Sequence, residues 1–138
     1  MKKKILIFLF IVYIAVLLRI TVFRSTGYDS YKYNFSVFYD LYHVYVSQGA
    51  WKFTYLFVGN IIWFVPYGFM LPLLNGKLQF LLVAIYGLFL TILVEFTQFV
   101  TKRGVFELDD LILNTVGVII GYGVYHITIG NKHRGKSK

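Results

Sequence analysis

The most constraining feature of the sequence is a set of four apolar segments, each long enough to cross a lipid bilayer. They cover about residues 5–23, 53–74, 78–100 and 109–129. A helix rises ~1.5 Å per residue, so ~20 residues cross the ~30 Å of hydrocarbon. In lipid every backbone polar group must be paired within the chain, and a helix achieves this. The sequence therefore predicts an all-α, polytopic membrane protein built as a four-helix transmembrane bundle.

Composition supports a lipid environment and excludes most soluble folds. Hydrophobic residues make up 58% of the 138 residues and charged residues only 14%, and the mean hydropathy is +0.67. Soluble proteins carry about 45–50% apolar and about 25% charged residues. A chain this short cannot hide the apolar surplus in a core. We expect one domain over residues 1–138, and the absence of cysteine excludes disulfides and thiolate metal sites.

The basic residues give the predicted helices a direction across the membrane. The net charge is +8, but the bases lie in short runs beside the apolar segments, so topology explains them better than nucleic-acid binding. Threading four helices puts eight bases and no acid on one side: Lys2, Lys3, Lys4, Lys77, Lys132, Arg134, Lys136 and Lys138. The other side balances six bases against six acids. Both termini are therefore expected in the cytoplasm.

The segment between the first and second helices is expected to be an aromatic-rich extracytoplasmic loop, residues 24–52. Its rings are Tyr28, Tyr31, Tyr33, Phe35, Phe38, Tyr39, Tyr42, Tyr45 and Trp51. Such rings favour the membrane interface, and a surface that stacks on a substrate is the alternative. Residues 17–20 offer no small-residue cleavage site, so we expect the first segment to stay as a helix.

Helical spacing sorts the few polar residues of the apolar segments onto faces. On the third segment one stripe holds Thr91, Glu95, Gln98 and Lys102. On the fourth segment a polar end continues into a small-residue groove, formed by Asp110, Asn114, Gly117 and Gly121. Such a groove lets another helix approach closely.

In the predicted topology these polar residues all lie in the outer half of the bilayer. The candidate binding residues are Arg19, Asn60, Glu95, Gln98, Arg103, Asp109, Asp110 and Asn114. Charges at this depth cost a few kcal/mol unless they are paired, so Arg19 or Arg103 is the expected partner of Glu95. The cluster is either an outward-facing pocket or a set of polar contacts that hold the helices together.

Other kinds of site have weaker support. Glu95 and Asp110 are candidate acid and base groups, but two adjacent aspartates at a helix start, Asp109 and Asp110, are more typical of an N-terminal cap. His43, His126 and His133 show no ligand spacing, so no metal site is predicted. We expect no cofactor.

Three stretches in the same order resemble the VanZ-like family: residues 60–72 (NIIWFVPYGFMLP), 95–98 (EFTQ) and 103–117 (RGVFELDDLILNTVG). The resemblance covers roughly residues 5–128. Residues 34–38 loosely resemble a further family stretch but lack its proline. The resemblance implies a bacterial plasma-membrane protein linked to low-level resistance to the lipoglycopeptide teicoplanin, with no established reaction. It also implies site positions at Asn60, Pro66, Gly68, Glu95, Gln98, Arg103, Asp109, Asp110, Asn114 and Gly117.

These observations favour a non-enzymatic protein whose outward pocket recognises lipids or lipidated molecules. A membrane-embedded enzyme that uses Glu95 and Asp110 on a lipid-linked substrate is the alternative, and ion movement has less support because the inner half of the bilayer contains no carboxylate. The expected partners are membrane lipids and a lipidated glycopeptide or a lipid-linked cell-wall precursor, without nucleic acid. An oligomer would form through the face of Gly117 and Gly121.

Overall fold

The computed structural model describes residues 2–22 and 27–130, and this part of the chain contains four long helices. They are α1 (Lys2–Thr21), α2 (Tyr39–Leu74), α3 (Phe80–Val100) and α4 (Leu108–Tyr125), and the π-helical turn η1 (His126–Gly130) follows α4. All four are long and apolar enough to cross a membrane. The predicted all-α, four-helix transmembrane architecture is confirmed, and the chain is a multi-pass membrane protein.

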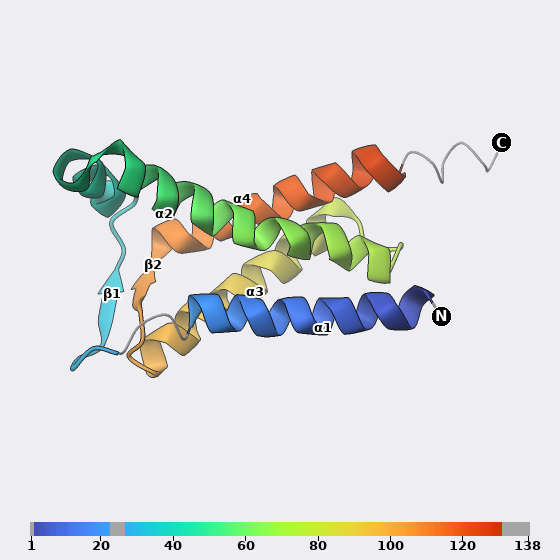
Figure 1. Ribbon diagram of the computed structural model, residues 1–138, viewed down its shortest axis with the longest axis horizontal. Helices are drawn as coiled ribbons and strands as arrows, with labels where there is room; N and C mark the ends of the chain where they lie inside the picture. The colour runs from blue at the N-terminus through green and yellow to red at the C-terminus, as the bar shows by residue number, and fades with distance from the viewer. Residues whose placement is uncertain (1, 23–26, 131–138) are drawn as a thin grey trace.

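The four helices run back and forth along one bundle axis (Figure 1). The start of α1, the turn between α2 and α3 and the last turn of α4 lie at one end, which we call the terminal end. The strands β1 (Lys32–Asn34) and β2 (Val105–Glu107) lie at the opposite end, which we call the strand end. The polar residues of α2, α3 and α4 are thereby brought toward the strand end.

The α2 helix is longer than predicted, because residues 39–48 form a helix where a loop was expected. It spans 36 residues and is broken at Gly49, whose φ of 84° and ψ of 169° are not helical. Residues with a side chain rarely adopt this φ, whereas glycine does so freely. Beyond this break the helix continues through Pro66 and Pro72.

The two strands form a short parallel sheet that the sequence analysis did not predict. Lys32 pairs with Val105, Tyr33 with Phe106 and Asn34 with Glu107. The N–H of Tyr28 also donates to the carbonyl of Lys102 at 2.7 Å. The segment that precedes α2 is therefore fastened to the connection between α3 and α4.

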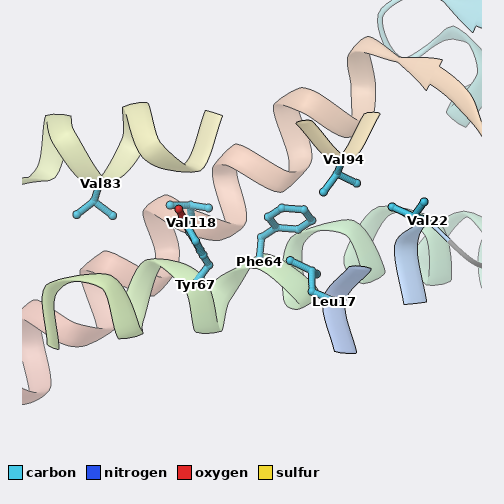
Figure 2. Packing of buried hydrophobic residues seen from close by; sticks show 7 residues of the cluster. All are labelled: Leu17, Val22, Phe64, Tyr67, Val83, Val94 and Val118. Atoms are coloured by element: carbon cyan, nitrogen blue, oxygen red, sulfur yellow. The ribbon is translucent and has the colours of Figure 1, made fainter. Parts of the chain in front are cut away.

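The buried core is small and is shared by all four helices. It consists of Leu17, Val22, Phe64, Tyr67, Val83, Val94 and Val118, and Figure 2 shows these side chains pointing into the space between the helices. Many large apolar side chains of α1 and α3 are exposed instead, among them Phe8, Ile11, Leu81 and Phe89. This pattern suits helices whose outer surfaces contact lipid tails.

The closest contact between helices joins α2 and α4 through glycines. A Cβ atom added to Gly117 would lie 2.2 Å from the carbonyl oxygen of Ile61, and one added to Gly121 would lie 2.0 Å from that of Val65. These distances are far below van der Waals contact, so no side chain fits there. The predicted small-residue groove is filled by α2 of the same chain. The oligomer contact expected at Gly117 and Gly121 stays a prediction, and it would require a second chain to displace α2.

The Gly121→Ala substitution tests this contact. It should lower the free energy of unfolding by ~1–3 kcal/mol or more, because α2 and α4 must move apart to make room for the Cβ atom. Gly123→Ala is the matched control on the same helix, since a Cβ at Gly123 meets nothing within 4 Å, and it should be neutral or slightly stabilising. Thermal unfolding in detergent micelles, followed by circular dichroism, compares them. Equal melting temperatures would contradict the proposed packing.

Candidate functional site

Two neighbouring polar cavities lie between the helices toward the strand end. The deep chamber has a volume of about 90 Å³, and its polar lining comprises Thr21, Asn60, Glu95, Gln98, Asp110 and Asn114 beside the rings of Tyr55, Trp63 and Phe64. The strand-end chamber has a volume of about 220 Å³, and its polar lining comprises Thr21, Tyr28, Asn60, Gln98, Arg103, Glu107 and Asp110. The two chambers are neighbours, because Thr21, Asn60, Gln98 and Asp110 line both.

Glu95 is buried on α3 and lines the deep chamber. Its side chain is 1% exposed, and its Oε2 accepts a hydrogen bond from the backbone N–H of Glu107 at 3.2 Å. Glu107 ends β2, so the sheet places a donor against this carboxylate. The expected ion pair of Glu95 with Arg19 or Arg103 stays a prediction.

Asp110 and Asn60 join α4 to α2 at the boundary between the chambers. The Nδ2 group of Asn60 donates to Oδ1 of Asp110. Hydrogen bonds to a charged acceptor are stronger than neutral ones, so this bond fixes the two side chains relative to each other. Both residues line both chambers.

Asn114 lies one helical turn further from the strand end and is 3% exposed. Its Nδ2 donates to Oγ1 of Thr91 on α3 at 2.8 Å. Asn114 lines the deep chamber, and its Oδ1 is buried and accepts a hydrogen bond from no described residue. A buried acceptor without a donor costs ~1–3 kcal/mol. A donor that reached this oxygen would recover that cost.

Gln98 connects the end of α1 to the turn that follows α3. Its Nε2 donates to the carbonyl of Thr21 at 3.2 Å, and its backbone carbonyl accepts the N–H of Arg103 at 2.9 Å. A Cβ at Gly104 would lie 2.6 Å from Oε1 of Gln98, so glycine is needed for this turn to close. The turn places Arg103 in the strand-end chamber.

Asp109 is buried, but it does not line either chamber. Its Oδ1 accepts the backbone N–H of Phe38 at 2.7 Å, which joins the start of α4 to the start of α2. The N-cap of α4 is Glu107, which makes no side-chain capping bond. Asp109 and Asp110 lie in the first turn, where negative charge complements the helix dipole. The hydrogen bonds described for their side chains nevertheless run to other segments.

The structure brings most of the predicted site residues together. Lining one or both chambers are Asn60, Glu95, Gln98, Arg103, Asp110 and Asn114. Arg19 is exposed on α1 and is not part of either lining. Lys102, expected on the polar stripe of α3, lies beyond the end of that helix with a φ of 55°.

Several lining residues were missed by the sequence analysis. They are Thr21, Tyr28, Gly104 and Glu107. Tyr28 and Glu107 belong to the segments that the short sheet brings together, and no pattern in the sequence indicated that sheet. Within the described residues, no three side chains of His, Asp or Glu are grouped as a metal site would require.

An apolar groove on the outer side of α2 adjoins the deep chamber. It has a volume of about 290 Å³, and we call it the α2 groove; it is lined by Trp51, Thr54, Tyr55, Leu56, Val58, Gly59, Asn60, Ile62 and Trp63. Tyr55, Asn60 and Trp63 line the groove as well as the deep chamber. An apolar groove thus adjoins a polar cavity between the helices.

Part of the predicted aromatic loop packs on α3 and β2. The rings of Tyr31 and Phe99 are 5.1 Å apart, and those of Phe35 and Phe106 are 6.1 Å apart. The ammonium of Lys102 lies 4.8 Å from the centre of the Tyr31 ring. These contacts lie at the strand end, opposite the terminal end of the bundle.

Comparison with known proteins agrees with the resemblance seen in the sequence. The profile of the VanZ/LLP1 family matches residues 10–129. The chain belongs to the VanZ/LLP1 family. Protein VanZ of Enterococcus faecium is 32% identical over 81 residues, which cover 59% of this chain and 49% of that protein, so the match spans about half of the relative. No solved structure matches the chain significantly. The family match includes all residues that line the deep chamber.

The hydrogen bond between Asp109 and Phe38 can be tested with Asp109→Ala. Removing a charged acceptor should cost ~1–3 kcal/mol, so amide hydrogen exchange in the peptide that contains residues 27–38 should accelerate roughly tenfold or more. Gln48→Ala is the control, because Gln48 is an exposed polar residue of α2 that lies outside the monitored peptide. Exchange that is equally slow in both variants and the original protein would contradict a fastening role for Asp109.

Proposed function

We propose that this protein binds lipids or lipidated molecules of the bacterial cell envelope, with the polar part of the ligand in the chambers. The observation that supports this most is the junction at Tyr55, Asn60 and Trp63, which line both the apolar α2 groove and the polar deep chamber. A ligand with an apolar tail and a polar head could occupy both spaces at once. Pockets with apolar walls and a few converging polar groups are typical of small-molecule sites.

We further propose that the strand end faces the outside of the plasma membrane. The terminal end carries Lys3 and Lys4 at the start of α1 and Lys77 in the turn between α2 and α3. An excess of lysine and arginine favours the cytoplasmic side of a membrane protein. In this orientation the strand-end chamber is open toward the envelope, where lipidated antibiotics and lipid-linked precursors are found.

The resemblance to the VanZ-like family favours resistance to teicoplanin as the physiological effect. Teicoplanin carries a lipid tail, which matches a site that combines an apolar groove with polar chambers. Recognition of the tail and its neighbouring groups would reduce the amount of drug that is anchored productively at the membrane. No reaction of the drug is required for this effect, so the protein acts as a binding protein in this proposal.

Susceptibility assays with teicoplanin and vancomycin in parallel test this function. The host expresses the original protein, Glu95→Gln or Asp110→Asn at equal membrane levels, with Asp29→Asn as a control that makes the same change at an exposed acid. Loss of a hydrogen bond to a charged group weakens binding roughly tenfold or more. We expect protection against teicoplanin alone, retained by Asp29→Asn and lost in the two chamber variants. Protection that survives both chamber variants would rule out the chambers as the site.

A membrane-embedded enzyme is the second candidate function. It is favoured by one observation, that Glu95 and Asp110 line the same small cavity. Two carboxylates in different surroundings can divide the roles of general acid and general base. The substrate would be a lipid-linked envelope molecule whose reacting bond enters the deep chamber.

Lipid profiling separates this enzyme from a binding protein. Cells that overexpress the original protein are compared with cells that express Glu95→Gln at the same level. An enzyme changes the composition of envelope lipids, and the variant abolishes the change, because removing an essential acid or base typically costs 10²–10⁴-fold in rate. Identical profiles in both strains and in the strain without the protein would exclude the enzymatic function under these conditions.

A further inference from the structure

The deep chamber presents hydrogen-bond acceptors to its contents. Glu95 supplies a carboxylate that is 1% exposed, and Asn114 supplies the buried Oδ1 that accepts from no described residue. Asp110 adds a second carboxylate to the lining. A ligand that fits these three groups must donate hydrogen bonds.

The amide groups of the chamber are oriented so that their N–H groups serve the protein itself. Asn60 donates to Asp110, Gln98 to the carbonyl of Thr21 and Asn114 to Thr91. The orientation of an amide determines whether its oxygen or its nitrogen faces the cavity. At Asn114, donation by the nitrogen to Thr91 leaves the oxygen without a donor among the described residues.

The charge of the lining favours a cation. Among the described residues that line the deep chamber there are two carboxylic acids, Glu95 and Asp110, and no lysine, arginine or histidine. A lining whose ionisable side chains are all acidic raises the local concentration of cations. The rings of Tyr55 and Trp63 add faces that attract cations.

We propose that the deep chamber binds a primary ammonium group carried by an amphipathic ligand, with its N–H groups directed to Glu95, Asp110 and Oδ1 of Asn114. This inference deepens the function proposed above and rests on it. A primary ammonium has three N–H donors, which equals the number of acceptor side chains. The cavity volume of about 90 Å³ suits a small group, since one water molecule takes up ~30 Å³ in the liquid.

The surroundings of the deep chamber fit the rest of such a ligand. Asn60 lines the deep chamber, the strand-end chamber and the α2 groove, so the three spaces meet at this residue. Arg103 lines the strand-end chamber, where it can face an anionic group of the same molecule. A zwitterionic lipid has one group for each space: an ethanolamine-like amine for the deep chamber, a phosphate for the strand-end chamber and an acyl chain for the α2 groove.

Quenching of tryptophan fluorescence by brominated lipids tests the proposal. The chain contains two tryptophans, Trp51 and Trp63, and both line the α2 groove, so quenching reports an acyl chain in that groove. The full chain is placed in nanodiscs with increasing fractions of brominated phosphatidylethanolamine, phosphatidylcholine or phosphatidylglycerol. Phosphatidylcholine has a quaternary ammonium without N–H donors, and phosphatidylglycerol has no amine.

We expect roughly tenfold tighter binding of phosphatidylethanolamine than of either other lipid. The preference should disappear in Glu95→Gln and Asn114→Leu, and it should persist in Asn114→Asp, which retains acceptor oxygens. Asp29→Asn, a neutralised acid that lines neither chamber, is the control and should keep the preference. If Asn114→Leu does not fold, Glu95→Gln and Asn114→Asp still decide the outcome.

The results separate this proposal from the broader function. Equal quenching by all three lipids, or a preference for phosphatidylglycerol, would overturn the ammonium site and leave lipid binding in the groove intact. No quenching by any lipid would overturn the lipid site altogether. Competition with soluble ethanolamine then identifies the source of the amine: relief of quenching indicates that a free amine suffices, and persistent quenching indicates that the ammonium must be part of a lipid.

Discussion

The architecture depends on the close backbone contact between α2 and α4. In lipid the hydrophobic effect does not drive helices together, so they associate where small residues allow close packing. The small residues on α4 are Gly117 and Gly121. On α2 the small residue is Gly68, where a Cβ would lie 1.9 Å from the carbonyl oxygen of Val118. The same contact brings Asn60 of α2 beside Asp110 of α4. The glycines thus determine the position of the polar groups that separate the two chambers.

The strand end is completed by contacts between segments that are distant in the sequence. The β1–β2 pairing and the bond from Phe38 to Asp109 fasten the segment before α2 onto the start of α4. One consequence is that Glu107 N–H reaches Glu95. The short sheet therefore has two effects: it covers the end of the bundle, and it supplies a donor to the most deeply buried carboxylate of the site.

The helices were predictable, but the closure of the strand end was not. Apolar length alone indicates a membrane span, and helical spacing placed Thr91, Glu95 and Gln98 on one face. The start of α2 was missed because residues 39–48 are too polar and aromatic to read as a span, and the break at Gly49 depends on one backbone conformation. The three-residue strands carry no periodicity long enough to detect. Asp109 was grouped with Asp110 for a different reason. Adjacent positions in a sequence do not show that two side chains point to different segments.

The balance of donors and acceptors distinguishes a binding site from polar contacts that only hold helices together. Purely structural contacts in a membrane protein pair their buried polar groups with one another, because each unpaired group costs free energy. The pairs Asn60–Asp110 and Asn114–Thr91 follow this rule. Oδ1 of Asn114 does not follow it among the described residues, and Asn114 lines a cavity. Replacing Asn114 itself by an apolar residue would remove the cost, so an amide kept at this position beside Glu95 favours a site that gains its missing donor from a ligand.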